Sequence, residues 1–181
     1  MCIGKIKGIY GNEIAVILGV DKNKTVKELY LEKLQKVSEN QEELYKRKEA
    51  VYWDDTLKEI LCKEFTIRSG KKVRKELKIV VDEEYEFMHC KVDRRIVGEN
   101  SILLCSIYSG IKAYEEVSKN VLLECQHNMR VTRADKCYVA FLINDKRFIF
   151  KEILRDEKLI SKIIEQEKKF YDNIVKEISL A

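Results

Sequence analysis

The chain has 181 residues, of which 45% are hydrophobic and 36% are charged, and its formal net charge is +4. This composition suits a single globular domain over residues 1–181 with a core of its own. A small net charge with both signs interspersed neither requires nor opposes nucleic-acid binding. The sequence has no apolar run of membrane-spanning length and no signal-peptide core after Met1, so we expect a cytoplasmic protein without membrane contact.

Six cysteines are scattered along the chain without a C-x-x-C pair. In an intracellular protein this pattern favours buried free thiols. Cys125 and His127 lie two residues apart and could form a zinc site with His89 and Cys90. Structural zinc sites usually show paired ligands at fixed spacing, so buried thiols are the prediction.

Two helices are predicted in the first third of the chain. Thr25, followed three residues later by Glu28, is typical of a capping box and predicts a helix that begins at Val26. A second helix is predicted over residues 41–65, ending before the turn at Ser69-Gly70.

Alternating, β-branched runs follow and predict strands over residues 71–81, 86–93, 101–108, 137–143 and 147–154. A helix over 122–131 separates the third of these strands from the fourth. The C-terminal segment is predicted to be an amphipathic helix with a hydrophobic face. That face comprises Ile160, Ile163, Ile164, Phe170, Tyr171, Ile174, Val175 and Ile178. The order of elements predicts a mixed α/β, or α+β, domain with a mostly antiparallel sheet flanked by helices.

Several segments, in matching order, resemble the YqaJ-type viral recombinases, the family that includes the phage lambda exonuclease. GNEIAVILGVDKNKTVKELYLEKL (11–34) resembles the family's opening, and VYWDDTLKEILCKEF (51–65) resembles its helix W-G-x-x-x-E. MHCKVDRRIVGEN (88–100) matches the segment that presents a catalytic aspartate. ECQHNMRVTRADKCYVAFL (124–142) resembles the family block that begins Q-x-Q-H. The resemblance implies a restriction-endonuclease-like fold of the lambda-exonuclease type, with a mixed central sheet flanked by helices.

The resemblance also implies a site, since family members cut DNA with one or two magnesium ions. Their ligands are a glutamate on the long helix, an aspartate, and an E-x-K on the following strand. Carboxylates hold such hard cations through oxygen, and the metal activates water. In this chain most of these positions are changed. The aspartate is retained as Asp93, but Lys58 replaces the helix glutamate. Leu104 and Ser106 replace the E and K of E-x-K. In Q-x-Q-H, Glu124 replaces the first glutamine, whereas Gln126 and His127 are retained.

These replacements predict a degenerate site with no catalytic residues and no bound metal, in which Asp93 is the residual candidate ligand. Asp93 is expected to form a structural turn or an ion pair with Lys58. Gln126 and His127 either contact phosphate or occupy packed, hydrogen-bonded helix positions. Glu59 and Glu99 lie close enough in sequence that either could rebuild a metal site.

We therefore expect that the chain is not an enzyme but a phage pseudonuclease that acts by binding. Its predicted partner is a CRISPR effector nuclease in the host cytoplasm, which would make it an anti-CRISPR protein. Two alternatives stay open. One is an active Mg²⁺-dependent 5′–3′ DNA exonuclease for phage recombination, with a site rearranged around Asp93, Glu59 and Glu99. The other is a non-catalytic DNA-end-binding accessory protein; the oligomeric state is open in each case.

Basic side chains are the candidate contacts to double- or single-stranded DNA, through its phosphates. They are Arg68, Lys71, Lys72, Arg74, Arg94, Arg95, Arg130 and Arg133. Such runs are also typical of solvated faces. The acidic segment 82–86 is either an ordinary loop or an imitation of phosphate charge, and Tyr52 and Trp53 are predicted to pack in the core.

Overall fold

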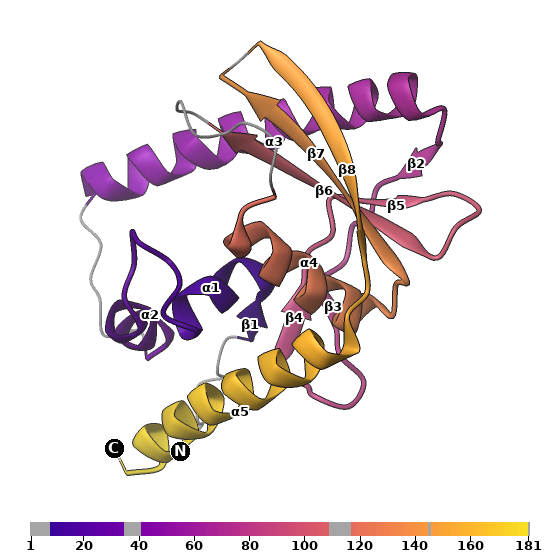
Figure 1. Cartoon of the computed structure of the whole chain (residues 1–181). Coiled ribbons are helices and arrows are strands. Elements are labelled where there is room, and N and C mark those ends of the chain that lie inside the picture. The colour runs from indigo at the N-terminus through magenta and orange to yellow at the C-terminus, as the bar shows by residue number, and fades with distance from the viewer. Residues whose placement is uncertain (1–7, 35–40, 109–116, 145, 181) are drawn as a thin grey trace.

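Two β-sheets and a set of helices around them make up the structure (Figure 1). This computed structural model describes residues 8–34, 41–108, 117–144 and 146–180. The helices are a 3-10 turn η1 (Gly11–Glu13), α1 (Ile14–Ile17), α2 (Val26–Lys33), α3 (Gln41–Ser69), α4 (Lys119–Thr132) and α5 (Glu157–Leu180). The strands are β1 (Ile9–Tyr10), β2 (Val73–Arg74), β3 (Val80–Val81), β4 (Met88–Cys90), β5 (Arg94–Ile96), β6 (Ser101–Tyr108), β7 (Lys136–Ile143) and β8 (Arg147–Leu154).

The larger sheet has five strands in the order β2-β5-β6-β7-β8. Its strands β6 and β7 are parallel, in register from Ser101 opposite Lys136 to Tyr108 opposite Ile143. The other neighbouring pairs in this sheet are antiparallel. A parallel pair needs a crossover connection, and α4 lies within the connection from β6 to β7. The predicted mixed, mostly antiparallel sheet flanked by helices is confirmed.

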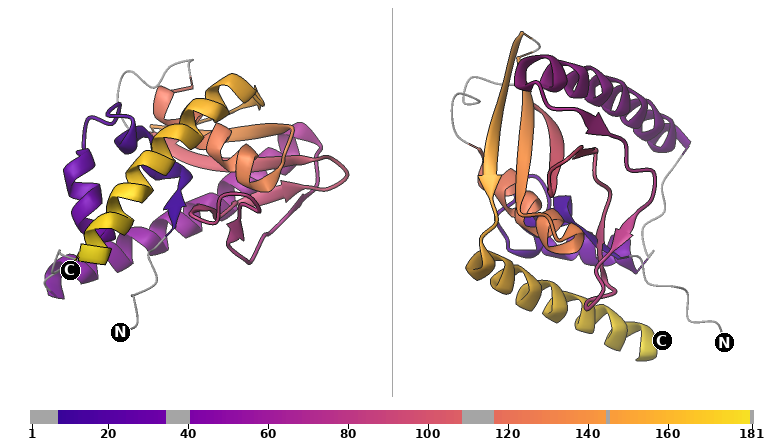
Figure 2. Two further views of the ribbon diagram at one scale, coloured as in Figure 1. Left: turned by 90° about the horizontal axis from the view of Figure 1, so that it is seen from below. Right: turned by 90° about the vertical axis from the view of Figure 1, so that its right-hand side faces the viewer.

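Helix α3 covers one face of the five-stranded sheet, and α4 lies against the other (Figures 1 and 2). The alternation of side chains along β6 explains this arrangement. Leu103 and Cys105 pack in one hydrophobic cluster with Phe65 of α3, whereas Ile102 and Leu104 pack in another with residues of α4. The strand expected to carry the E-x-K motif is therefore buried on both of its faces.

The smaller sheet, in the order β1-β4-β3, is linked to helices α4 and α5 by a buried polar contact. Nδ1 of His127 in α4 lies 2.7 Å from Oε1 of Glu167 in α5, and both side chains are fully buried. Nε2 of His127 lies 2.9 Å from the carbonyl oxygen of His89 in β4, to which it must donate. Burial alone would lower the pKa of His127, but the Glu167 carboxylate raises it, and burial raises the pKa of Glu167. Strand β4 and helices α4 and α5 are thus joined at the His127 side chain.

The helices predicted from capping and periodicity are confirmed, with small changes at their ends. Thr25 Oγ1 accepts a hydrogen bond from the Glu28 N–H, and Oε2 of Glu28 accepts one from the Thr25 N–H, as a capping box requires. Helix α3 continues one turn beyond the predicted residue 65 and ends at Ser69. Gly70 then adopts a left-handed backbone, with a φ of +70°, which a glycine enters without strain.

The strand predicted over residues 71–81 is wrong, because this segment divides between the two sheets. Its first part pairs with β5 as β2, and its last part pairs with β4 as β3. Between them, residues 75–79 belong to no strand. Strand β5 was not predicted, since its sequence Arg-Arg-Ile lacks an extended hydrophobic alternation.

The core position predicted for Tyr52 and Trp53 is also wrong, since these side chains are 64% and 54% exposed. The two rings contact each other edge to face, with their centroids 5.5 Å apart. In Figure 1 the N-terminal half of α3 extends beyond the edge of the larger sheet. Only the C-terminal half, which contributes Leu61 and Phe65, therefore has a sheet surface to pack against.

The five cysteines of the described residues are free and buried, as predicted. The Sγ atoms of Cys62 in α3 and Cys105 in β6 face each other at 3.5 Å. Within the described ranges no group of three His, Cys, Asp or Glu side chains is arranged to hold a metal ion, and both nitrogens of His127 have other contacts. The zinc alternative therefore finds no support among these residues.

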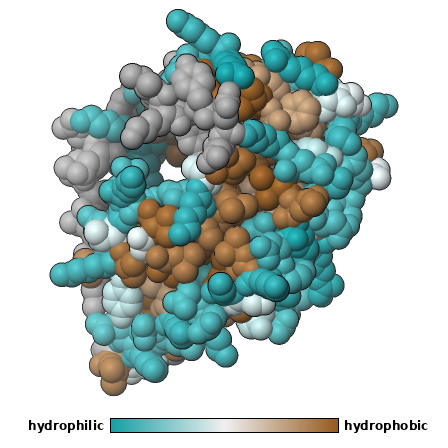
Figure 3. Space-filling model, in the orientation of Figure 1, coloured by the Kyte–Doolittle hydropathy of each residue, from teal (hydrophilic) through white to brown (hydrophobic). Residues whose placement is uncertain are grey.

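The face seen in Figure 1 carries a hydrophobic band across its middle, surrounded by hydrophilic residues (Figure 3). No helix in the described part of the chain is long and apolar enough to cross a membrane.

Candidate active site

Lys58 of α3 lies between two carboxylates. Its Nζ is 3.3 Å from Oδ1 of Asp93 and 3.0 Å from Oδ2 of Asp54, which is one helical turn earlier. Burial alone would lower the pKa of Lys58, but the negative charges of Asp93 and Asp54 raise it above its ordinary value. The side chain is therefore a charged ammonium. The predicted ion pair with Asp93 is confirmed, and Asp54 is an additional partner that the sequence analysis missed.

Asp93, just before β5, uses both of its carboxylate oxygens. Oδ1 faces Lys58, and Oδ2 accepts a hydrogen bond of 2.8 Å from the backbone N–H of Cys105. Burial raises the pKa of Asp93, whereas Lys58 and the Cys105 N–H act in the opposite direction. These contacts tie the retained aspartate to α3 on one side and to β6 on the other.

The residues of β6 at the E-x-K positions supply no charge to this site. Leu104 is 6% exposed and belongs to the core cluster under α4. Ser106 is half-buried and carries only a hydroxyl. A second carboxylate and a lysine are therefore both missing from the strand beside Asp93.

Glu124 of α4 is a further acidic group at this site. Burial raises its pKa to about 7, and the negative charge of Asp93 adds to the increase, while Lys58 opposes it. The backbone of Gly11 in η1 approaches α4 closely here, since a Cβ on Gly11 would lie 3.0 Å from Cγ of Glu124. Lys58 of α3, Asp93 just before β5 and Glu124 of α4 thus come from separate parts of the chain and interact electrostatically.

Gln126 and His127, the retained part of Q-x-Q-H, have structural contacts. Gln126 is 1% exposed, and its Nε2 donates to the carbonyl oxygen of Leu154 at 2.8 Å. Its Oε1 accepts from the N–H of Asp156 at 2.9 Å. His127 makes the buried contact with Glu167. Of the two predicted roles, the packed, hydrogen-bonded position is therefore the one confirmed.

Glu59 and Glu99, which could have rebuilt a metal site, pair with other cations. Glu59 accepts hydrogen bonds from Arg94 and Lys75, and these lower its pKa to about 2. Glu99 pairs with Lys71 and accepts a hydrogen bond from Ser101. In the described structure Glu59 and Glu99 are thus engaged by cations other than Lys58, whereas Asp54 shares Lys58 with Asp93 and Glu124 interacts electrostatically with Asp93.

Six of the eight basic candidates for DNA contact form ion pairs with carboxylates in the described structure. The pairs are Arg68–Glu64, Lys71–Glu99, Arg94–Glu59, Arg95–Glu76, Arg130–Asp82 and Arg133–Glu83. Arg130 also contacts Glu84, so the acidic loop 82–86 binds the end of α4. Lys72 and Arg74, around β2, are exposed. DNA contact by these eight residues stays a prediction.

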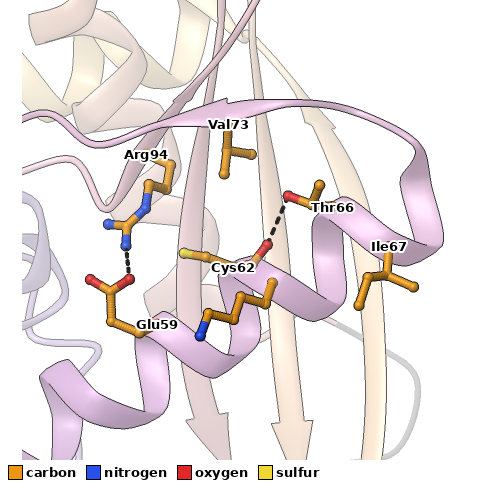
Figure 4. A pocket seen from close by; sticks show the side chains of 7 residues that line it. Glu59, Cys62, Thr66, Ile67, Val73 and Arg94 are labelled. Atoms are coloured by element: carbon orange, nitrogen blue, oxygen red, sulfur yellow. Dashed lines mark hydrogen bonds and ion pairs between the residues drawn. The ribbon is translucent and has the colours of Figure 1, made fainter.

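A shallow pocket of about 360 Å³ lies beside the site, between α3 and the strands β2 and β5 (Figure 4). Its polar end is the ion pair of Glu59 with Arg94, and its floor includes Cys62. Thr66 Oγ1 donates to the Cys62 carbonyl at 3.0 Å within α3. The ion pair of Glu59 with Arg94 neutralises two of the charged groups that line this pocket, and the third is the exposed Lys63.

Magnesium is the ion that the family resemblance implies, and it requires near-octahedral coordination by oxygen atoms. At Asp93 the neighbouring charged groups are the ammonium of Lys58, which also pairs with Asp54, and the buried carboxyl of Glu124. Among the described residues, no three His, Cys, Asp or Glu side chains are arranged to hold a metal ion. The residues present do not fit a magnesium ion in this arrangement.

The mixed sheet flanked by helices, with an aspartate presented beside β6, defines a restriction-endonuclease-like fold. The chain belongs to the YqaJ family: the model of the YqaJ-like viral recombinase domain matches residues 5–135. It is also 40% identical over 181 residues to the uncharacterized protein YqaJ of Bacillus subtilis (strain 168). That match covers 96% of this chain and 55% of the relative, so the chain spans about half the length of the curated protein that it matches.

Solved structures that are similar to this chain include exonucleases. An alkaline exonuclease (LHK-Exo) from Laribacter hongkongensis, in complex with dAMP, is similar with a TM-score of 0.71 and 15% identity, over 98% of this chain and 93% of that one. A phage-related exonuclease from Haemophilus somnus 129PT is similar with a TM-score of 0.65 and 17% identity, over 94% of this chain and 96% of that one. The predicted lambda-exonuclease type of fold is confirmed.

These comparisons correct one prediction from the sequence. The expectation that the chain is not an enzyme is contradicted, because the chain belongs to a recombinase family and the alkaline and phage-related exonucleases share its fold. The replaced ligands led to that expectation. The replaced ligands show which residues occupy the site, but they do not by themselves show that the chain lacks enzymatic activity.

Proposed function

We propose that this chain acts on the ends of linear DNA as a 5′–3′ exonuclease in viral recombination. The observation that carries the proposal is the position of Asp93. This aspartate, retained from the family's site, is presented between α3 and β6, where Lys58 and Glu124 interact with it. The family and the fold make DNA the expected substrate.

The ionisable groups beside Asp93 can serve a phosphodiester hydrolysis. In that reaction the oxygen of a water molecule forms a bond to phosphorus, the bond from phosphorus to the leaving oxygen breaks, and the leaving oxygen takes up a proton. Glu124, with a pKa of about 7, can accept the proton of the attacking water at neutral pH. The ammonium of Lys58 can stabilise negative charge that develops on the phosphate.

Most of the basic candidates that DNA would meet near this site already pair with carboxylates. Lys72 and Arg74 are exposed near β2, which pairs with β5 directly after Asp93. The six ion-paired candidates would have to exchange a carboxylate for a phosphate in order to contribute. We therefore expect weak, salt-sensitive binding to duplex DNA.

The test is incubation of linear duplex DNA, labelled at its 5′ ends, with the purified chain in Mg²⁺, in Mn²⁺ and in EDTA. Release of labelled nucleotides is expected, with loss of release in the Asp93→Asn variant. Asp55→Asn, an exposed aspartate on the same helix as Lys58, is the matched control and should behave like the parent protein. Intact DNA in all three conditions, from protein shown to be folded by circular dichroism, would refute the proposal.

A CRISPR effector as partner, and with it a counter-defence role, stays a prediction from the sequence. None of the described contacts and none of the relatives' names points to such a partner. The chain spans about half the length of its curated relative, so any partner of that whole relative is for this chain a proposal only.

A further inference from the structure

The cation in this site is part of the chain itself. Lys58 Nζ lies within ion-pair distance of Asp93 and of Asp54 at the same time. Since Asp54 and Lys58 are one helical turn apart, α3 holds them on the same face, and their pairing does not depend on a ligand. The side chain of Asp93 is only 12% exposed, so its charge needs a partner close by.

We propose that the ammonium of Lys58 takes the place that a divalent metal ion would have at Asp93, so that the chain engages DNA without a metal at this position. A metal ion at Asp93 would have to displace the ammonium, because the two positive charges would otherwise lie a few ångströms apart. At about 4 Å such a repulsion is substantial even at the effective dielectric near a protein surface.

The other walls of the site agree with this proposal. A hard cation gathers several oxygen ligands, but Leu104, at the position of the family's second carboxylate, packs in the core cluster with α4 and supplies none. No three His, Cys, Asp or Glu side chains of the described residues are arranged to hold a metal ion. Oδ2 of Asp93 is directed to the Cys105 N–H. An ammonium, by contrast, is a hydrogen-bond donor, and Asp54 and Asp93 supply acceptors for two of its three N–H groups.

The experiment measures the binding of Mn²⁺ alone to the full chain, by electron paramagnetic resonance of the free ion. Lys58→Glu replaces the ammonium with a carboxylate at the position where the family has its helix glutamate. Lys63→Glu, at an exposed lysine on the same helix, makes the same change of charge away from Asp93. Circular dichroism of each variant checks that it is folded.

We expect the parent chain and Lys63→Glu to bind Mn²⁺ only weakly, and Lys58→Glu to bind it about 10-fold to 100-fold more tightly. Adding Asp93→Asn to the Lys58→Glu variant should remove the gain. The proposal is overturned if the parent chain binds Mn²⁺ and loses that binding through Asp93→Asn. It is equally overturned if folded Lys58→Glu binds no better than Lys63→Glu, because Lys58 would then not be what occupies the position.

This result is separate from the proposed exonuclease activity. DNA degradation that persists in EDTA would support both proposals. Degradation that requires Mg²⁺ and is lost in Asp93→Asn would retain the exonuclease and overturn the role of Lys58. Intact DNA in every condition would remove the exonuclease, while the Mn²⁺ measurement would still decide what occupies the site.

Discussion

Replacing Lys58 with methionine tests how much the ion pair at Asp93 stabilises the fold. The substitution keeps much of the length of the side chain and removes its charge, which leaves the Asp93 carboxylate without a cation. The Lys58 and Asp93 side chains are 27% and 12% exposed. Exposed pairs are worth about 0.2–1 kcal/mol, and breaking a fully buried pair costs about 3–5 kcal/mol. We therefore expect the free energy of unfolding to fall by about 2 kcal/mol near neutral pH.

The pH dependence of this loss follows from the pKa directions. The pKa of Lys58 is raised in the folded chain, so its stabilisation is fully present below the ordinary value of 10.5 and is lost only as the pH rises through the higher folded value. In the variant, an uncompensated Asp93 carboxylate, whose pKa burial already raises, is costly when charged. The deficit should therefore be largest near pH 8, where Asp93 is charged, and smaller at pH 5, because a raised pKa lets Asp93 take up a proton more readily as the pH falls.

Urea denaturation of the parent chain and the variant at these two pH values provides the measurement. Lys63→Met, on an exposed part of the same helix, is the control and should change the free energy of unfolding by less than about 0.5 kcal/mol. Equal losses in the two variants, or a Lys58→Met loss that does not change with pH, would refute the reasoning.

Three other substitutions test separate features of the fold. Glu167→Gln should cost about 2–3 kcal/mol. Glu167 raises the pKa of His127 in the folded chain, so the stabilisation from this pair is fully present below the ordinary histidine pKa of 6.5 and is lost as the pH rises through the folded value. The loss of unfolding free energy in Glu167→Gln should therefore shrink as the pH rises, and a loss that grows with pH would contradict the prediction. Gly11→Ala should cost about 1–3 kcal/mol, since the new Cβ would lie 2.5 Å from Oδ1 of the buried Asn128, and unchanged urea denaturation would contradict this close approach. Trp53→Ala should lower the melting temperature little, with a change below about 0.5 kcal/mol, whereas a loss of several kcal/mol would restore the core position that we reject.

Local sequence patterns predicted most of the long elements, because those elements depend on spacing within one segment. The capping box at Thr25 and the hydrophobic face of α5 are of this kind. The same spacing could have identified Glu167 as buried, since it continues the series Ile163, Glu167, Phe170 and Ile174 at steps of four, three and four residues. Because Glu167 is charged, it was not included in the predicted hydrophobic face, although its spacing places it there.

The site was predicted only in part, for reasons that lie in tertiary structure. The pair of Lys58 with Asp93 was predicted because a lysine replaces the family's helix glutamate while the aspartate is retained. Asp54 could also have been predicted as a partner, because it lies four residues before Lys58 on the same helix. The interaction of Glu124 with Asp93 depends on how α4 crosses the sheet, which the spacing of residues does not encode. The exposure of Trp53 depends in the same way on where the sheet ends beneath α3.

The buried cysteines allow local opening of this protein to be measured by thiol labelling. A thiol reagent modifies only an exposed thiolate, so the rate of labelling at each cysteine follows how often its surroundings open. Cys62 and Cys105 lie in the cluster between α3 and the larger sheet, whereas Cys90, Cys125 and Cys137 lie in the cluster beneath α4. Separate labelling rates for the two groups would therefore show whether the two faces of the sheet detach together or one before the other, without a cysteine introduced by mutation.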